Sequence, residues 1–337
     1  MTYTWLWFWV ISFWVEKPIP IVQEKILGVN WVAPARPVGD SVFVSVQSVG
    51  AKAITLMPYA FLPPESSTLL FHTDTTSDLA FQWWGETPAG VRACINMAHA
   101  QGIQVWLKPH VWLKNGEFTG TFRPHSWDDL EKSYRQYILQ YVKICQETKV
   151  HGLIMGTEWA RWVNERPQFW ENLIQEIRTL YPGKLTYAEN WDAIYAFPHW
   201  HRLDFVGVDA YFPLSPQAQP TEKQLISGWK KHITGLKSLA QSSQKPVLFT
   251  EFGYTDAEYT AHEPWKETEH STAPHVQARA LDVLLTQFLS QPWFAGGFVW
   301  KWFPIPPRRG RDRFSPQGKA AEQILKKHYL GNSRKTL

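Results

Sequence analysis

The feature that most constrains this chain is a regular alternation between short apolar runs and amphipathic stretches over almost its whole length. The apolar runs are rich in β-branched and aromatic residues, so we expect each of them to form a strand. Eight such runs occur, at residues 26–31, 53–59, 103–110, 152–158, 184–190, 205–211, 247–251 and 296–302. Strands that alternate with helices predict a parallel sheet.

The amphipathic stretches carry the signals of helix ends. Thr87 followed by Pro88 is typical of a helix N-terminus, and Gly102 is typical of a residue that ends a helix. Three further helices are predicted from their apolar stripes, at residues 127–147, 169–181 and 277–289. No glycine-rich phosphate loop follows the first run, which argues against a dinucleotide-binding sheet. Eight strand–helix units therefore predict a closed (β/α)₈ barrel, the TIM barrel.

The length of 337 residues suits a single domain of this kind, because a (β/α)₈ barrel needs roughly 250 residues. We assign residues 25–305 to the barrel and residues 306–337 to a basic loop and a C-terminal helix that close it. Residues 1–24 form an N-terminal segment whose apolar part, residues 2–15, is shorter than the roughly 20 residues that span a bilayer and lacks the basic start of a signal peptide. Residues 2–15 could be a poor signal sequence, a membrane contact or a segment packed on the barrel. Export, membrane association and a cytoplasmic location therefore all stay open.

The charge and the cysteines argue against several classes of function. A net charge of +4 is mild, and the basic run at residues 308–313 is expected to be a solvated loop, so we expect no nucleic-acid partner. Cys94 and Cys145 have neither metal nor redox spacing and are expected to be buried free thiols, although a disulfide stays open. Neither an H-E-x-x-H nor a G-x-S-x-G motif occurs. We therefore expect no metal, no cofactor and no protein partner.

Two glutamates stand at strand ends, where the catalytic groups of barrels gather. Glu158 ends the fourth apolar run and Glu251 ends the seventh. Every second residue of 154–158 and of 247–251 shares a face with its glutamate, and if those faces point inward both carboxyl groups lie at the barrel mouth. Retaining glycosidases need two carboxyl groups about 5–5.5 Å apart. A single strand-end glutamate is often only a solvated carboxylate, but the pair predicts a glycosidase.

Seven motifs give the chain a resemblance to a known family. They are WWGETP at 83–88, KPHVW at 108–112, GTEWAR at 156–161, YAENWD at 187–192, DFVGVDAYFPL at 204–214, TEFGY at 250–254 and GGFVWKWF at 296–303. With them the sequence resembles glycoside hydrolase family 113, whose known members are chiefly β-1,4-mannanases in a clan of retaining (β/α)₈ enzymes. The resemblance implies endo-hydrolysis of β-mannan, with Glu158 as acid/base and Glu251 as nucleophile. The wider clan usually has Asn before the acid/base, where this chain has Thr157.

The strand ends also supply candidates for binding the sugar. His110 and Asn190 are candidates for hydrogen bonds to sugar hydroxyls, Asn190 for the 2-hydroxyl, and Tyr211 is a candidate partner of Glu251. Trp300 is a candidate floor for the cleaved sugar. Some of the 20 tryptophans are expected to be sugar platforms and the rest core, because a Trp ring offers a large apolar face. The candidate walls, each as readily a core residue, are Trp31, Trp84, Trp112, Trp159, Trp162 and Trp191.

The other polar residues near the predicted mouth are given supporting roles. Lys108 and Asp209 fall on inward faces and are expected to form a buried structural pair. The segment 252–274, which contains Tyr254 as a further substrate-binding candidate, is too long for a routine connection and is predicted to rim the cleft. Two further carboxylates are held in reserve, Glu86 and Glu189.

Three functions stay open on this sequence. The first is a β-mannanase that acts within a β-linked polysaccharide or oligosaccharide. The second keeps the retaining hydrolase but changes its substrate to another β-linked glycan or to the end of a mannoside chain. These two differ only in a few hydrogen bonds around the cleaved ring. The third is a carbohydrate-binding barrel without catalysis.

Overall fold

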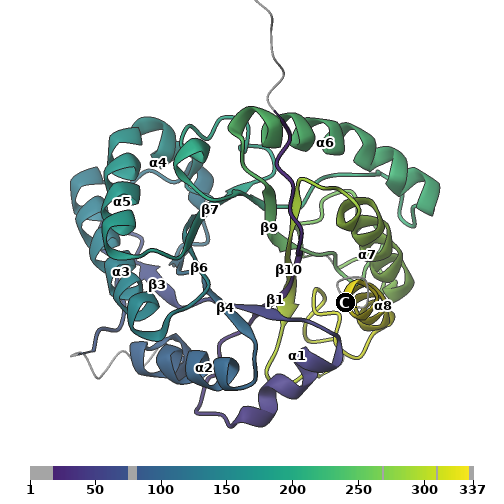
Figure 1. The fold of residues 1–337 in the computed structure, drawn as a ribbon, viewed down its shortest axis with the longest axis horizontal. Coiled ribbons are helices and arrows are strands. Elements are labelled where there is room, and N and C mark those ends of the chain that lie inside the picture. Colours follow the sequence, from purple (N-terminus) through teal and green to yellow (C-terminus); the bar gives the residue numbers. More distant parts are fainter. Residues whose placement is uncertain (1–17, 75–81, 268, 309, 334–337) are drawn as a thin grey trace, which may run out of the picture.

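The computed structural model describes residues 18–74, 82–267, 269–308 and 310–333, and there the chain folds as a closed barrel ringed by helices (Figure 1). Eight strands pair in parallel in the order β1, β10, β9, β8, β7, β6, β4, β2 and back to β1. Their bounds are β1 (Ile26–Trp31), β2 (Ala53–Leu56), β4 (Gln104–Leu107), β6 (Gly152–Thr157), β7 (Lys184–Asn190), β8 (Val206–Asp209), β9 (Val247–Phe252) and β10 (Phe294–Trp302). The predicted (β/α)₈ barrel is confirmed.

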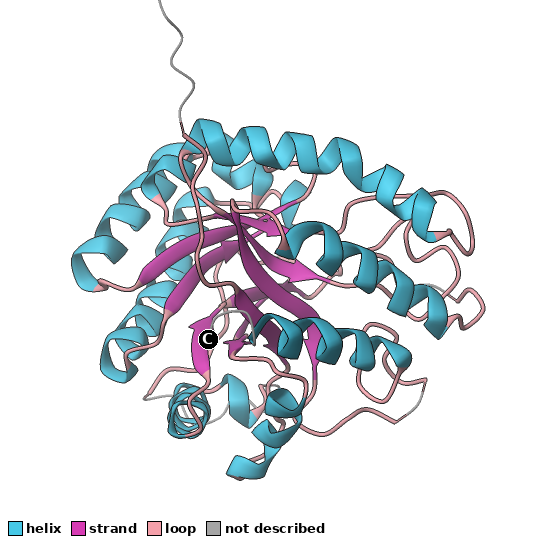
Figure 2. Cartoon of the chain, turned by 45° about the vertical axis from the view of Figure 1, so that its right-hand side comes forward, coloured by secondary structure: helices cyan, strands magenta, loops and turns pink. Residues whose placement is uncertain are grey.

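Helices cover the outside of the barrel (Figure 2). They are α1 (Val44–Ser48), α2 (Pro88–Ala100), α3 (Trp127–Thr148), α4 (Ala160–Glu165), α5 (Pro167–Leu180), α6 (Glu222–Ser243), α7 (Pro274–Leu289) and α8 (Ala320–Ser333), with short 3-10 helices η1 (Asp40–Phe43), η2 (Trp84–Glu86), η3 (Thr119–Thr121) and η4 (Trp200–Arg202). The Thr87 hydroxyl accepts a hydrogen bond from the Gly90 amide at 3.1 Å, and Gly102 has a φ of +72°. Both predicted ends of α2 are therefore confirmed.

A separate small sheet follows two of the barrel strands. It consists of the parallel strands β3 (Tyr59–Leu62) and β5 (His110–Leu113). The barrel strands before them, β2 and β4, end three residues earlier than predicted. Pro58 and Pro109 lie in the two gaps, and proline has no N–H to donate to a ladder. Tyr59 and His110 therefore begin the small sheet instead of ending barrel strands.

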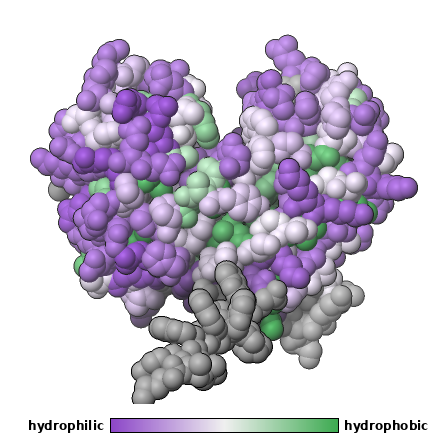
Figure 3. Space-filling model, turned by 90° about the horizontal axis from the view of Figure 1, so that it is seen from above, coloured by the Kyte–Doolittle hydropathy of each residue, from purple (hydrophilic) through white to green (hydrophobic). Residues whose placement is uncertain are grey.

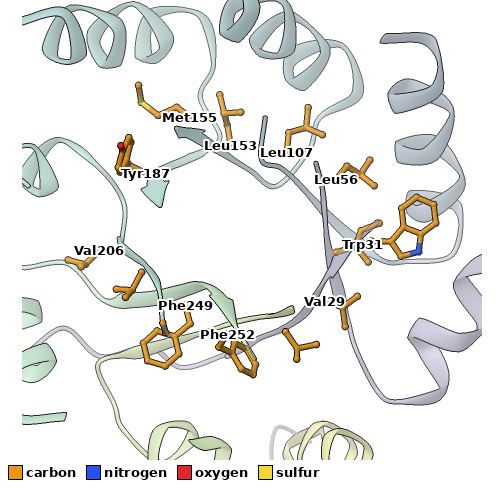
Figure 4. Packing of buried hydrophobic residues seen from close by; sticks show 14 of the residues in the cluster. Val29, Trp31, Leu56, Leu107, Leu153, Met155, Tyr187, Val206, Phe249 and Phe252 are labelled. Carbon is orange, nitrogen blue, oxygen red and sulfur yellow. The ribbon is translucent and has the colours of Figure 1, made fainter. Parts of the chain in front are cut away.

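The barrel is filled by side chains and is not a pore. Its interior cluster consists of Ala53, Trp106, Ile154, Ala188, Leu248, Ala295 and Phe298. A larger apolar layer lies between the strands and the helices, and Figure 4 shows part of it on the outer face of the barrel, including Val29, Trp31 and Phe249. Seen from above, the molecular surface rises as two lobes with a deep notch between them (Figure 3). Because the interior is packed, only the ends of the barrel offer space for a ligand.

Strand β9 does not keep the alternation that its sequence predicts. Leu248 fills the barrel interior, whereas Phe249 packs outward with its ring 4.8 Å from an aromatic ring of α7. Phe249 and Glu251 then pair with consecutive residues of β8, so a β-bulge returns Glu251 to the inside. The shared face expected for residues 247–251 is wrong, although Glu251 does point inward. Strand β6 departs in the same way, because a β carbon on Gly156 would meet the outward-facing Tyr187 ring.

Three further predictions concern the two cysteines, the N-terminal segment and the basic run. Cys94 and Cys145 are buried free thiols, as expected. Residues 1–17 lie outside the described residues, so the role of the apolar segment stays a prediction, as do the domain limits at 24 and 305. No helix within the described ranges is long and apolar enough to cross a bilayer. The basic run is not simply solvated, because Arg313 donates to Asp256 at 3.0 Å and is mostly buried.

Candidate active site

Glu251 lies at the mouth of the barrel among polar side chains from other strands. Only 6% of its surface is exposed. The Lys108 ammonium donates a hydrogen bond to Oε1 at 2.5 Å, and the Tyr211 hydroxyl donates to Oε2 at 2.7 Å. The Nε2 atom of His110 lies 3.9 Å from Oε1. Both carboxyl oxygens are thus held by donors, and the contact expected between Tyr211 and Glu251 is present.

Lys108 joins Glu251 to a second buried carboxyl group, that of Asp209. The Lys108 Nζ lies 3.1 Å from Asp209 Oδ1, which also accepts a hydrogen bond from the Thr250 hydroxyl at 2.7 Å. Burial favours the neutral form of Lys108, but the charges of Asp209 and Glu251 outweigh it and raise the pKa of the lysine. Burial, and then the charge of Glu251, raise the pKa of Asp209 to about 7. The predicted pair of Lys108 and Asp209 is present. Its role is not only structural, because the Lys108 ammonium also contacts Glu251.

Glu158 directly follows β6 and has an unusual backbone. Its φ is +56°, in the left-handed region that non-glycine residues seldom adopt, and its amide donates to the Ala188 carbonyl of β7 at 2.8 Å. Burial, and then the negative charges of Asp209 and Glu251, raise the pKa of Glu158 well above its usual value. A carboxyl group that keeps its proton near neutral pH is what a general acid requires.

His110 lies between the carboxyl cluster, formed by Glu158, Asp209 and Glu251, and the aromatic rings of Tyr59 and Trp300. Its ring lies 6.4 Å from that of Trp300 at an interplanar angle of 27°, and 5.1 Å from that of Tyr59. Burial, and then the charge of Lys108, hold the pKa of His110 well below its usual value. This environment favours the neutral imidazole, which can both donate and accept hydrogen bonds, as sugar hydroxyls do.

A cavity of about 440 Å³ opens beside Trp300. Trp112, a predicted wall, and Trp300, the predicted floor, both line it, and Trp112 is 55% exposed. Trp84 packs against the core instead, and its neighbour Trp83, which was not among the predicted walls, lines the cavity. The sequence does not indicate which of the two tryptophans faces the cavity, because the short η2 turn lacks the regular alternation of a strand. The full lining is Val32, Ala33, Met57, Tyr59, Phe61, Trp83, Glu86, Trp112, Trp300 and Lys301.

The two reserve carboxylates take different positions. Glu86 lines the cavity, and burial raises its pKa to about 7. Glu189 is buried, accepts a hydrogen bond from the Asn190 amide at 2.9 Å, and has a pKa raised by burial to about 8. Asn190 pairs in register with Asp209 on β8, which brings it near the carboxyl cluster. Its Oδ1 accepts a hydrogen bond from the amide of the partly buried Trp191 at 3.1 Å.

Four of the aromatic candidates are core residues, which corrects the prediction: no more than 2% of the surface is exposed in Trp31, Trp159, Trp162 and Tyr254. Asn30 takes the inward position on β1 and donates hydrogen bonds to the Thr250 and Phe298 carbonyls. Alternation along β1 therefore turns Trp31 outward, where it stacks on Phe43 with 5.0 Å between ring centroids. Side chains buried to this extent have no face left to contact a sugar.

A model of Glycoside Hydrolase Family 113 matches residues 62–307, which is most of the chain. The chain belongs to glycoside hydrolase family 113. The resemblance carried by the seven motifs is thereby confirmed, and the protein is a glycoside hydrolase that acts on a glycan. No curated protein matches this glycoside hydrolase.

Solved structures of similar fold include members of the same family. One described as a complex of GH113 β-1,4-mannanase has 22% identity and a TM-score of 0.77, covering 91% of this chain and 99% of its own. The GH113 β-mannanase AaManA from Alicyclobacillus acidocaldarius, in complex with ManMIm, has 20% identity and a TM-score of 0.75, covering 91% and 97%. A β-glucuronidase from Faecalibacterium prausnitzii has 14% identity and a TM-score of 0.59, covering 94% and 49%. At these identities the likeness shows the barrel fold.

Proposed function

We propose that this glycoside hydrolase is a retaining endo-β-1,4-mannanase, with Glu251 as nucleophile and Glu158 as acid/base. The observation that carries the proposal is the contrast between the two carboxyl groups. Glu251 accepts hydrogen bonds from Lys108 and Tyr211, which fix its orientation. Burial and neighbouring negative charges raise the pKa of Glu158. Two carboxyl groups with such different environments suit a nucleophile and an acid.

The reaction follows from these two environments. A Glu251 oxygen bonds to the anomeric carbon while the glycosidic C–O bond breaks, and the Glu158 proton moves to the leaving oxygen. Glu158, now a carboxylate, then takes a proton from water as the water oxygen bonds to the anomeric carbon and Glu251 departs. Lys108 and Tyr211 stabilise the departing carboxylate. Two inversions at one carbon give net retention.

The proposal of a mannan substrate rests on the family and on its solved neighbours. The family 113 structures described above carry the names β-1,4-mannanase and β-mannanase. The lining of the cavity beside Trp300 suits pyranose rings, because it combines the aromatic side chains of Trp112 and Trp300 with the carboxyl group of Glu86.

The roles of the two glutamates are tested with an activated aryl β-mannoside. Glu251→Ala is expected to lower kcat by at least about 10³-fold, because the covalent step is lost. Azide should restore turnover and give a glycosyl azide of inverted configuration. Glu158→Gln should slow hydrolysis of an oligosaccharide far more than that of the aryl substrate, whose leaving group needs no proton. Glu189→Gln is the matched control, because it changes another buried glutamate whose pKa is raised. Full activity of Glu251→Ala would refute the mechanism.

The substrate is tested with the unmodified chain on mannan, cellulose, xylan and mixed-linkage glucan. A rapid fall in mannan viscosity with oligosaccharide products supports an endo-mannanase. Release of mannose alone would indicate an enzyme that cuts from the chain end. Activity on another polymer but not on mannan would refute the substrate and leave the chemistry in place. Binding without any hydrolysis would indicate a carbohydrate-binding barrel.

A further inference from the structure

A pair of tryptophans lies across the barrel mouth from the cavity. Trp191 follows the last residue of β7, and Trp265 belongs to the long segment after β9. Their rings stack, with centroids 5.8 Å apart and an interplanar angle of 22°. Trp191 is backed by Phe212 at 5.8 Å, whereas Trp265 remains 45% exposed. The pair is thus a supported aromatic surface that is open to solvent on its outer ring.

The segment that carries Trp265 is held in place. The Ala261 carbonyl accepts hydrogen bonds from the Leu214 amide at 2.8 Å and from the Ser215 amide at 3.1 Å. Earlier in the same segment, Asp256 forms ion pairs with Arg313 and Lys319 at 3.0 Å each. A surface held by such contacts can bind a ligand without first having to be ordered.

The strand order places this pair opposite the cavity. In the ring β1, β10, β9, β8, β7, β6, β4, β2, strand β7 is the fifth and so lies across from β1. The cavity lies at the ends of β1, β2 and β10, since Val32, Met57 and Trp300 line it. Glu251 on β9 and Glu158 after β6 lie on either side of the line between the two. A chain of sugars that runs from the cavity to the tryptophan pair therefore passes between the two glutamates.

Contacts around the two glutamates indicate which end of this sugar chain is on the leaving-group side of the cut. Trp300 lines the cavity and stacks on His110, whose Nε2 lies 3.9 Å from Glu251. The cavity therefore adjoins the proposed nucleophile. On the other side, the Glu158 amide bonds to Ala188 of β7, the strand that leads directly to Trp191. An acid must stand on the side of the leaving group that it protonates.

We propose that the stacked pair Trp191–Trp265 is a binding site for the leaving-group side of the substrate, where it receives one or two pyranose rings of the β-linked chain. The proposal rests on the proposed function, because the direction of the path depends on the roles of the two glutamates. The ring faces supply an apolar surface for the sugar C–H groups. The site would favour long chains over short ones and would also accept a sugar as an acceptor in place of water.

The test compares two substrates, of which only one has sugars on the leaving-group side. β-1,4-Mannohexaose places sugars on both sides of the cut, whereas β-mannobiosyl fluoride places only a fluoride there. Trp265→Ala should lower kcat/KM for the hexaose about tenfold more than for the fluoride, a difference of ~1.4 kcal/mol. Trp265→Phe, which keeps a ring, should restore most of the loss. Trp112→Ala is the matched control, because an exposed cavity tryptophan should lower both values by the same factor.

The outcomes separate this proposal from the proposed function. Equal losses on the two substrates in Trp265→Ala, in a parent enzyme that cleaves both, would overturn the leaving-group site alone. A parent that cleaves neither substrate would refute the proposed function. In that case the binding site is tested by calorimetric titration of parent and variant with mannohexaose. Weaker binding by Trp265→Ala than by the parent supports the site, whereas equal binding by the two, or no binding by the parent, overturns it.

Discussion

Lys108 is the residue whose removal tests the electrostatics of the site most directly. Its ammonium is fully buried and lies between two carboxyl groups, 2.5 Å from Glu251 Oε1 and 3.1 Å from Asp209 Oδ1. Lys108→Met keeps most of the side-chain volume and removes the charge. Two buried carboxyl groups then lose their common partner, so both stability and activity should fall.

The size of the effect follows from burial. Removing one partner of a buried ion pair lowers the free energy of unfolding by about 3–5 kcal/mol. Asp209 offsets part of this loss by taking up a proton, since its pKa is already about 7. We therefore expect a loss of about 3 kcal/mol near pH 8. A chain of 337 residues unfolds with about 2.1 cal/mol/K per residue, which converts this loss to a Tm lowered by about 4 °C. The kcat should fall on the order of 10²-fold.

The loss of stability in Lys108→Met should depend on pH. A carboxyl group whose pKa is raised on folding binds more protons in the folded chain, so Asp209 makes the parent less stable as pH rises from about 4 to about 7. The charge of Lys108 lowers the pKa of Asp209. Without that charge the decline should continue to higher pH, and the Tm difference from the parent should be larger near pH 8 than near pH 5.

The assay is thermal unfolding of parent and variant over this pH range, together with kcat on an aryl β-mannoside. Lys52→Met is the matched control, because Lys52 forms an exposed pair with Glu24 at 3.8 Å, and its loss should change stability by no more than about 0.5 kcal/mol. Equal Tm and kcat in Lys108→Met and Lys52→Met would show that the buried ammonium contributes neither stability nor catalysis.

Three further predictions concern single side chains. Tyr211→Phe removes the hydroxyl 2.7 Å from Glu251 and should lower kcat about 10- to 100-fold with little change in Tm; an unchanged kcat would show that Lys108 alone orients the carboxylate. Trp31→Ala should lower the free energy of unfolding by about 3–5 kcal/mol in urea and leave KM unchanged, and a raised KM would return Trp31 to the substrate site. Glu86, with its pKa of about 7, should make the parent less stable as pH rises from about 4.5 to 7. Glu86→Gln should flatten that part of the Tm profile, and an unaltered slope would contradict the raised pKa.

The glutamate at the end of strand β9 shows how a correct prediction can rest on a wrong reason. Simple alternation placed Glu251 on the face of Phe249, yet Phe249 packs outward against α7. The bulge that separates them leaves no mark in the local sequence, because it depends on how β9 pairs with β8 and β10. The position at the strand end was predictable, and the direction of the side chain was not.

The tryptophans show the same limit. Trp31, Trp112 and Trp159 stand at or near strand ends in similar apolar surroundings, yet two are core and Trp112 is 55% exposed. Trp112 belongs to the small β3–β5 sheet, which appears only after Pro58 and Pro109 interrupt the barrel strands. An apolar ring suits a core and a sugar equally well, so residue type alone cannot separate the two.

The sequence by itself determined the barrel, its eight strands, the family and the two glutamates at strand ends, because these depend on periodicity and on residues close together in the chain. Only the tertiary structure decided that Lys108 joins Glu251 to Asp209, that Trp83 lines the cavity in place of Trp84, and that Trp191 meets Trp265. These contacts join residues that are distant in sequence or turn on a bulge or a short turn. They depend on which side chains meet once the strands have closed into a ring, and no local pattern encodes those long-range contacts.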